Sequence, residues 1–141
     1  MKPYISMITL GVKDLHRAVR FYQQGMGLHT QGIVGEEFAQ GTVAFFDLQQ
    51  GLKLALFPQQ SLAEDTGLPL SDGPAVMSLA HNVLSETDVD EVMQQASMAG
   101  AKIVKSPQKT FWGGYAGYFQ DPDGHLWEIV WNPDFLPEYD K

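Results

Sequence analysis

The feature that most constrains the fold is an order of strands and helices that occurs twice along the chain. Each half reads as a strand, an amphipathic helix and three further strands, over residues 4–58 and again over residues 75–133. The apolar helix positions are related by a constant shift of 74 residues, with Leu15, Ala18, Val19 and Tyr22 corresponding to Val89, Val92, Met93 and Ala96. The repeat predicts two copies of one βαβββ unit, whose open sheet faces would curl toward each other around a cleft.

The strands of the first half are predicted from short apolar runs bounded by turn residues. We expect them at residues 5–12, 28–33, 43–46 and 52–57. Asp14 is a good N-cap for the intervening helix, which Gly25 and Gly27 end. Residues 59–74 are rich in Pro, Gly, Ser and Asp, and they read as a linker or surface loop with room for one helical turn near Leu62.

The second half follows the same order and closes with a hairpin. We expect a strand over residues 76–83, a helix capped by Thr87 and a strand at residues 103–104. The stretch Asp121-Pro122-Asp123-Gly124 then has hairpin-turn chemistry, because proline presets φ and glycine tolerates the left-handed conformation. Residues 134–141 form an acidic tail.

The hairpin turn also sets a register in which Tyr118 lies opposite Glu128. One face then carries Ala116, Tyr118, Leu126, Glu128 and Val130, and the other carries Gly117, Phe119, Trp127, Ile129 and Trp131. Both faces are largely apolar, so both should be covered. Glu128 is therefore a carboxylate in an apolar strand, and burying it is costly unless it is paired, hydrogen-bonded or bound to a metal.

Composition narrows the classes of partner. The chain has 141 residues, enough for one domain or two small fused modules, and a formal net charge of −8. That charge argues against nucleic acid or an anionic membrane as a main partner, because both require basic patches. The absence of cysteine excludes disulfides, thiolate metal sites and cysteine nucleophiles. With no signal peptide and no membrane-spanning run visible, we expect a cytoplasmic protein.

Two stretches together carry a family resemblance. They are Gly11-Val12-Lys13-Asp14-Leu15…Phe21-Tyr22…Gly27-Leu28 and Asp121-Pro122-Asp123-Gly124-His125-Leu126-Trp127-Glu128. The chain thereby resembles the vicinal oxygen chelate superfamily, which includes glyoxalase I, bleomycin-resistance proteins, fosfomycin-resistance enzymes and extradiol dioxygenases. The resemblance implies an α+β fold of two βαβββ modules, with a curved, mostly antiparallel sheet enclosing a cleft. It also supports a homodimer, which the open sheet faces and edges favour independently.

Enzymes of this superfamily usually bind a divalent metal through four side chains. The resemblance assigns these positions to Met7, about Ala55, about Ser78 and Glu128. Only Glu128 suits a hard cation, because a thioether is a soft ligand and alanine has no donor. No ligand spacing links the four histidines, His16, His29, His81 and His125. We therefore expect no metal and no other cofactor.

Candidate ligand-binding residues come from the aromatic loop and from the inner face. Phe111, Trp112 and Tyr115 could stack on a flat or apolar ligand, or form a dimer contact or a lid over the core. Ser78, Asn82 and Tyr118 would be polar groups on the inner face, which could orient a ligand or satisfy one another. Glu128 could be a catalytic base or bind a ligand donor, or it could be protonated or hydrogen-bonded to Tyr118 or Asn82.

Three functions follow from these residues. The first is metal-independent binding of a small apolar or aromatic ligand, as in bleomycin-resistance proteins. The second is an enzyme of the superfamily (a lyase, isomerase or dioxygenase) that uses Glu128 as base or metal ligand. The third is a regulatory or partner-binding domain that acts through the acidic tail.

Overall fold

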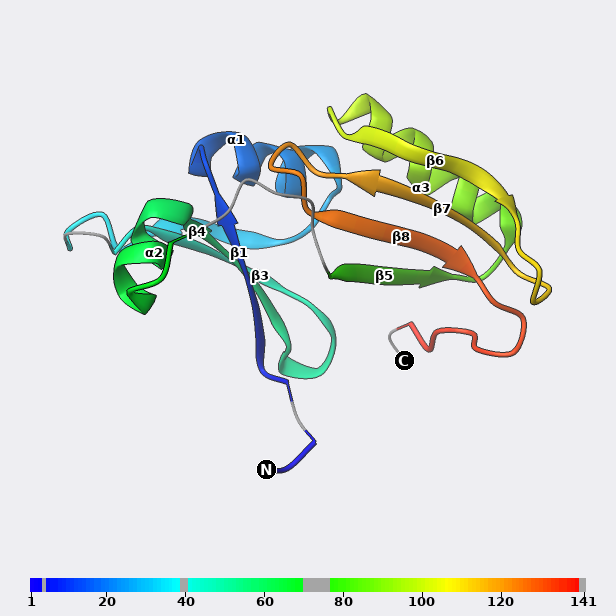
Figure 1. Ribbon diagram of the computed structural model, residues 1–141, viewed down its shortest axis with the longest axis horizontal. Helices are drawn as coiled ribbons and strands as arrows, with labels where there is room; N and C mark the ends of the chain where they lie inside the picture. Colours follow the sequence, from blue (N-terminus) through cyan, green and yellow to red (C-terminus); the bar gives the residue numbers. More distant parts are fainter. Residues whose placement is uncertain (4, 39–40, 70–76, 140–141) are drawn as a thin grey trace. The chain divides into compact units, whose positions relative to one another are not determined.

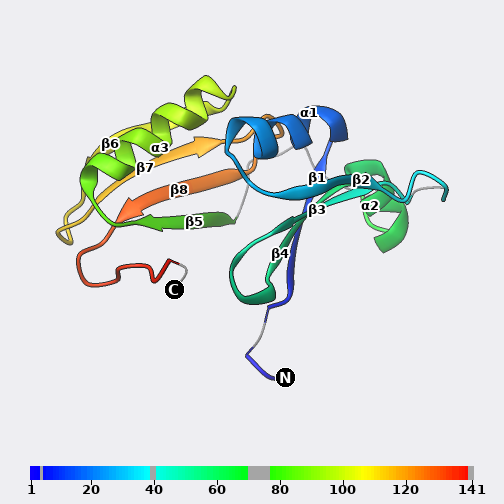
Figure 2. The ribbon, with the colours of Figure 1, turned by 180° about the vertical axis from the view of Figure 1, so that it is seen from behind.

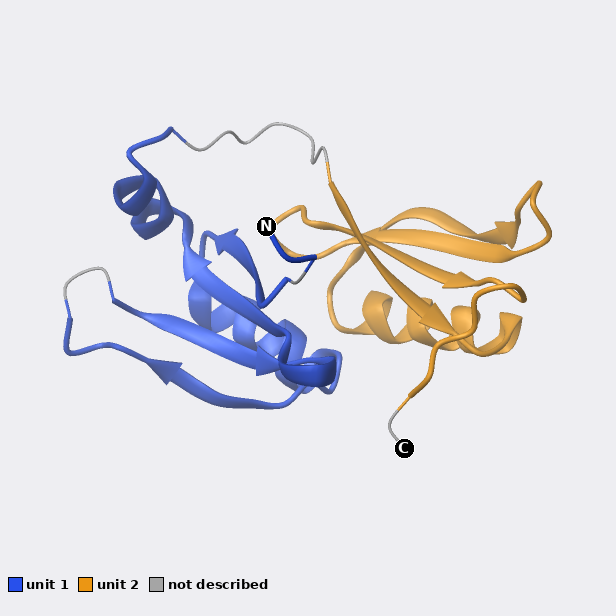
Figure 3. Cartoon of the chain, turned by 90° about the horizontal axis from the view of Figure 1, so that it is seen from below, with its two compact units in different colours: residues 1–73 blue, residues 74–141 orange. Residues whose placement is uncertain are grey.

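The computed structural model describes residues 1–3, 5–38, 41–69 and 77–139. The chain divides into two compact units, unit 1 over residues 1–73 and unit 2 over residues 74–141, shown in different colours in Figure 3. Each unit contains one four-stranded sheet, with strand orders β1-β4-β3-β2 and β5-β8-β7-β6. The prediction of an α+β fold built from two βαβββ units is therefore confirmed, as two separate mixed sheets.

Unit 1 contains a sheet whose outer strand β1 runs parallel to its neighbour β4, while the remaining pairs are antiparallel. The strands are β1 (Met7–Val12), β2 (Thr30–Val34), β3 (Val43–Asp47) and β4 (Lys53–Pro58). Helix α1 (Leu15–Arg20) continues into a π-helical turn (Phe21–Gly25), and α2 (Gln59–Thr66) follows β4 (Figure 1). The N-cap of α1 is Asp14, as predicted, since its Oδ1 accepts the Arg17 N–H at 3.0 Å.

The core of unit 1 lies between α1 and one face of this sheet. Tyr22 makes an edge contact with Phe46, with ring centroids 6.0 Å apart, and both rings are almost fully buried. Phe45 points to the other face because side chains alternate along β3, and it remains 37% exposed. We call this second face the open face of unit 1.

Unit 2 repeats the same plan around one longer helix. Its elements are β5 (Ser78–Val83), α3 (Glu86–Met98), β6 (Lys102–Lys109), β7 (Tyr115–Gln120) and β8 (Leu126–Trp131). Helix α3 covers one face of the sheet, as the view in Figure 2 shows, and its own residues Val89, Met93 and Ala96 are buried. Gly117 lies under Met93, where an added Cβ would come within 3.0 Å of the methionine Cε. We call the face away from α3 the open face of unit 2.

The hairpin of β7 and β8 has the predicted register, with Tyr118 opposite Glu128. Gly124 has a φ of 88°, so the turn uses the left-handed conformation that glycine permits. Phe119 and Trp127 stack at 6.3 Å on the α3 side, and Phe119 is 2% exposed. The predicted division of the hairpin into two faces is thus confirmed.

The segment after β8 lies against the edge strand β5. The side-chain amide of Asn82 donates to the carbonyl oxygen of Phe135 at 3.4 Å, and the Tyr139 hydroxyl donates to the carbonyl oxygen of Asn82. The Tyr139 ring also lies 6.1 Å from the His81 ring. This segment therefore occupies one backbone carbonyl of the edge strand, that of Asn82.

Three local predictions need correction. Helix α2 has eight residues rather than one turn near Leu62; its mostly polar sequence gives no apolar stripe. The N-cap of α3 is Ser85, whose hydroxyl accepts the Asp88 N–H at 3.1 Å, so Thr87 lies inside the helix. Strand β6 is longer than residues 103–104. Parts of the predicted linker and first strand of the second half, residues 70–76, fall outside the described residues.

No helix in the described ranges is both long enough and apolar enough to cross a membrane.

Candidate functional site

A pocket of about 310 Å³ lies on the open face of unit 2. Its floor comes from β7 and β8, one side comes from β6, and the turn between β6 and β7 forms the rim. It is lined by Lys105, Gln108, Lys109, Thr110, Phe111, Trp112, Ala116, Tyr118 and Glu128. Four residues that the sequence singled out, from three different segments, therefore meet in one place: Phe111, Trp112, Tyr118 and Glu128.

A hydrogen bond between two of these side chains forms the polar centre of the pocket. The Tyr118 hydroxyl donates to Glu128 Oε2 at 2.7 Å, and both side chains are half-buried. The cause is the hairpin register, which places the two residues directly opposite each other on adjacent strands. On the other side of Glu128 the register partner is Ala80 of β5, whose methyl group offers no hydrogen bond.

The titration of Tyr118 gives a direct test of this contact. The hydrogen bond to the Glu128 carboxylate, with a smaller contribution from burial, raises the pKa of Tyr118 above its ordinary value of 10.0. We expect Glu128→Gln to bring that pKa back toward 10.0. The raised folded-state pKa stabilises the protein fully below pH 10, and this stabilisation is lost as pH rises through the folded-state pKa.

The measurement is ultraviolet absorbance of tyrosinate against pH, with Tyr118→Phe to assign the transition. Tyr115 needs its own control, because its bond to Asp90 also raises its pKa. Asp90→Asn should move only the Tyr115 transition. An unchanged Tyr118 transition in Glu128→Gln would show that the two side chains do not interact in solution.

The aromatic rim is held by a closed turn. The Thr110 N–H donates to the Gly114 carbonyl at 3.0 Å, and the Gly114 N–H donates to Thr110 Oγ1 at 2.9 Å. The Trp112 ring lies over Gly114, where an added Cβ would come 2.0 Å from a ring carbon. Glycine is therefore needed here for close approach of the ring. Phe111 is fully exposed and Trp112 is 40% exposed, so both rings are accessible to a ligand.

The other predicted site residues lie outside the pocket lining. Tyr115 is on the α3 side of the sheet, where its hydroxyl donates to Asp90 Oδ1 at 2.7 Å. Asn82 shares the open face, but its amide is bonded to the carbonyl oxygen of Phe135. Ser78, exposed at the start of β5, has Leu126 as its register partner. The structure thus brings together four of the seven candidates and leaves Tyr115, Asn82 and Ser78 apart from them.

Sequence reasoning missed the side of the pocket that β6 supplies. Lys105 is the register partner of Tyr118, and Gln108 is the register partner of Ala116, so both lie on the open face. The missed signal was strand length, since residues 105–109 were not assigned to a strand. Alternation on a longer β6 would not have identified both positions, because a register shift between Lys105 and Gln108 puts an odd-numbered and an even-numbered residue on the same face.

The residues at the four expected metal positions do not fit a divalent metal. On adjacent strands, Met7 has the ammonium-bearing Lys53 as register partner, and Glu128 has Ala80. Ala55 has no donor. Within the described part of the chain, no group of three or more His, Asp or Glu side chains is placed to hold a metal ion. Hard cations require several oxygen ligands, and Glu128 with its tyrosine partner does not supply them.

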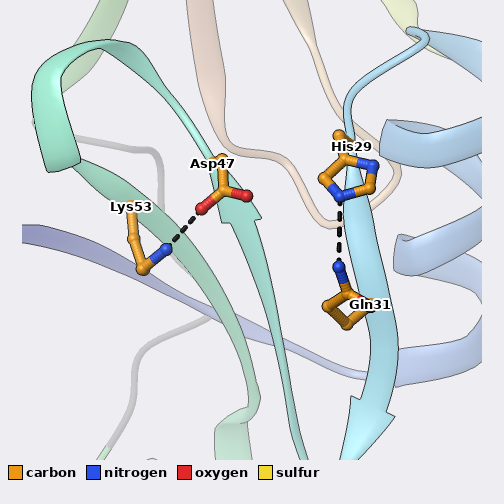
Figure 4. A network of polar contacts seen from close by, with 4 residues as sticks. All are labelled: His29, Gln31, Asp47 and Lys53. Carbon is orange, nitrogen blue, oxygen red and sulfur yellow. Dashed lines mark hydrogen bonds and ion pairs between the residues drawn. The ribbon is translucent and has the colours of Figure 1, made fainter.

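The open face of unit 1 has a hollow of its own, with a volume of about 480 Å³. It is lined by Met7, Gln31, Gly32, Val34, Phe45, Asp47 and Lys53. Figure 4 shows its polar contacts: Lys53 forms an ion pair with Asp47, and the Gln31 side-chain amide contacts His29 Nε2 at 3.3 Å. The hydrogen bond from Lys53 lowers the pKa of Asp47. The lysine of this hollow therefore has a carboxylate partner within the chain.

Comparison with known proteins gives a consistent result. A sequence profile of the Glyoxalase/Bleomycin resistance protein/Dioxygenase superfamily matches residues 4–129. A glyoxalase-related enzyme from Fulvimarina pelagi is similar in structure, with a TM-score of 0.80 and 37% identity over 93% of this chain and 89% of that one.

More distant structures share the fold. A superfamily enzyme from Burkholderia phytofirmans has a TM-score of 0.73 and 21% identity, covering 89% of this chain and 96% of its own. A mutant of the fosfomycin resistance protein FosX from Listeria monocytogenes, solved with Mn(II) and 1S,2S-dihydroxypropylphosphonic acid, has a TM-score of 0.66 and 24% identity, covering 92% and 90%.

Curated sequences match over a short stretch only. An uncharacterized protein from Mycobacterium bovis is 41% identical over 46 residues, which is 33% of this chain and 30% of that protein. The match thus spans less than a third of the length of this relative.

Proposed function

Because the chain belongs to the glyoxalase/bleomycin resistance protein/dioxygenase superfamily, we propose that it binds a small aromatic or apolar molecule in the unit 2 pocket without a divalent metal. The observation that carries this proposal is the meeting of Trp112 and Phe111 with the Tyr118–Glu128 hydrogen bond in one pocket. Aromatic surface with a few placed polar groups is the usual lining of a small-molecule site.

The pocket volume limits the size of the ligand. About 310 Å³ is at the small end of the range for ligand pockets. A molecule with one aromatic ring and one or two substituents fits such a volume. Its ring would lie against Trp112, and a hydroxyl or amide group would donate to the Glu128 carboxylate.

The absence of a suitable ligand set supports metal independence. Glu128 already accepts the Tyr118 hydroxyl, which is a charge-assisted hydrogen bond and lowers the cost of its partial burial. The neighbouring strand positions supply no second oxygen or nitrogen ligand from an acidic or histidine side chain. The role of the carboxylate is therefore to orient a bound molecule.

An enzymatic role is the second candidate, because the Fulvimarina pelagi protein is named a glyoxalase-related enzyme at 37% identity. In that case Glu128 would accept a proton from the bound molecule and Tyr118 would hold the carboxylate in place. A chelator distinguishes the two candidates, because it should abolish a metal-dependent activity but should leave metal-independent binding unchanged.

A homodimer is also part of the proposal. Size-exclusion chromatography followed by light scattering tests it by giving the mass of the protein in solution.

Glu128→Gln tests the proposed site. We expect the variant to fold normally and to weaken binding of one-ring fragments that carry a hydroxyl or amide donor by about tenfold or more, because a hydrogen bond to a charged group is lost. Quenching of Trp112 fluorescence measures the affinity, and Trp112→Phe identifies the signal among the three tryptophans. Asp90→Asn is the matched control, because it removes the partner of a tyrosine on the other face.

Two outcomes would contradict the proposal. Equal affinity of such fragments for the wild type and Glu128→Gln would remove Glu128 from the site. A loss of several kcal/mol of stability in Glu128→Gln, the scale expected when a buried ionic network is broken, would make the residue structural.

A further inference from the structure

We propose that the ligand of the unit 2 pocket is an anion, whose carboxylate or phosphate group is bound by Lys105 while its other end meets Tyr118 and Glu128. This inference rests on the proposed function of the same pocket and adds the charge and the orientation of the ligand. Lys105 lines the pocket on the β6 side, and Glu128 lies at its floor. Lys109 also lines the pocket, but its register partner is Tyr115, on the α3 side of the sheet, so the proposal rests on Lys105.

The sheet register places a cation, a phenol and a carboxylate in one row. Lys105 is the register partner of Tyr118, and Tyr118 is the register partner of Glu128. All three side chains therefore lie on the open face, on the successive strands β6, β7 and β8. Two strand spacings, about 10 Å, separate the backbone of the lysine from that of the carboxylate. A one-ring molecule with substituents at opposite ends spans such a distance.

Lys105 has no carboxylate partner among the described residues, whereas the lysine of the other pocket has one. In the unit 1 hollow Lys53 is paired with Asp47. Lys105 lines the same pocket as Glu128, but the Glu128 carboxylate accepts the Tyr118 hydroxyl. A ligand anion would be a partner for Lys105.

The position of Glu128 fixes the orientation of such a ligand. A carboxylate or phosphate placed beside Glu128 would meet a like charge, which costs energy in a half-buried site. The anionic end therefore belongs at the β6 side, and a neutral hydrogen-bond donor belongs at Glu128. The aromatic rings of Phe111 and Trp112 would then contact the apolar middle of the ligand.

Lys105 could serve solubility instead. Strand β6 is an edge strand, and lysines on edge strands prevent sheets of different molecules from pairing. In that role Lys105 would not make the pocket prefer acids to their neutral analogues. The experiment must therefore separate a contribution to anion binding from a contribution to solubility.

The experiment measures fragment binding to the full chain by quenching of Trp112. The fragments are one-ring carboxylates and phosphates, each paired with its neutral amide or alcohol. The variant is Lys105→Gln, which removes the charge but keeps the length of the side chain. Lys102→Gln is the matched control, because it removes the same charge from β6 at a position that does not line the pocket.

We expect the acid of each pair to bind more tightly than its neutral analogue. Lys105→Gln should weaken binding of the acids by about threefold, which is within the range for partly exposed ion pairs. The neutral analogues and the Lys102→Gln variant should be unaffected. Added salt should weaken only the acids.

The outcomes separate the two proposals. If neutral fragments quench Trp112 as well as the acids, and Lys105→Gln changes neither, the inference of an anionic ligand is overturned while the proposed binding function stands. If no fragment of either kind binds, the proposed function fails and this inference fails with it. If Lys102→Gln weakens the acids as much as Lys105→Gln, the effect is one of overall charge, and the assignment to the pocket is wrong.

Discussion

Phe46→Ala lowers the free energy of unfolding by about 3–5 kcal/mol, the usual cost of deleting a buried phenylalanine ring. Phe46 has no exposed surface and makes an edge contact with the buried Tyr22. Its removal leaves a cavity between α1 and the sheet of unit 1, because the strands on either side are held by backbone hydrogen bonds and cannot collapse into it.

The matched control for this prediction is the preceding residue. Phe45 lies on the open face of unit 1 and is 37% exposed, so Phe45→Ala should cost about 1 kcal/mol or less. Denaturant unfolding followed by circular dichroism gives both values, and hydrogen exchange of the β3 and β4 amides locates the loss. Equal effects of the two substitutions would show that the faces of β3 are assigned incorrectly.

Asp121→Ala lowers the free energy of unfolding by about 3 kcal/mol, because one buried carboxylate oxygen accepts hydrogen bonds from two backbone N–H groups of the hairpin turn. Asp121 is 3% exposed, and its Oδ1 accepts the N–H groups of Asp123 at 2.9 Å and His125 at 2.8 Å. Without this oxygen both N–H groups lose their partner in the turn between β7 and β8.

Asp121→Asn is the control for this prediction, because the amide keeps an oxygen that can accept the same two N–H groups. It should lose less stability than Asp121→Ala. Fluorescence of Trp127 and Trp131, which lie in the second strand of the hairpin, follows the unfolding transition. A loss in Asp121→Ala of less than about 0.5 kcal/mol, the level of an ordinary surface substitution, would mean that the turn does not depend on this side chain.

The fold could be predicted from the sequence where a strong period or a specific turn was present. The apolar spacing at Leu15 and at Val89 identified α1 and α3, and the turn at Asp121 to Gly124 fixed the register that places Tyr118 opposite Glu128. Tyr115 was predicted to lie in the aromatic loop with Phe111 and Trp112. The alternation of the hairpin, extended to residue 115, instead puts it with Gly117 and Phe119 on the face that α3 covers, where it contacts Asp90.

The elements that could not be predicted have polar sequences without a clear period. Helix α2 contains Gln59-Gln60-Ser61 at its start and has no apolar stripe. Strand β6 includes Pro107 and two register shifts, so its edge position is visible only after pairing with β7. The docking of Tyr139 on β5 uses a backbone carbonyl, for which no side-chain pattern exists.

The pocket lining could be predicted only in part, for the same reason. The hairpin pattern pointed to its floor, whereas its β6 side depended on the length of that strand. Of the lining residues, Glu128, Tyr118, Phe111 and Trp112 were predicted as candidates, and Lys105 and Lys109 were missed.

The central claim is that the unit 2 pocket binds a small molecule without a divalent metal. The most direct test is the affinity of one-ring aromatic fragments, read from Trp112 quenching, in EDTA and again after addition of Mn(II), Ni(II), Zn(II) or Fe(II). The account predicts measurable binding in EDTA, the same affinity with each metal, and a loss in Glu128→Gln. Binding that appears only after a metal is added, or no quenching under any condition, would contradict it.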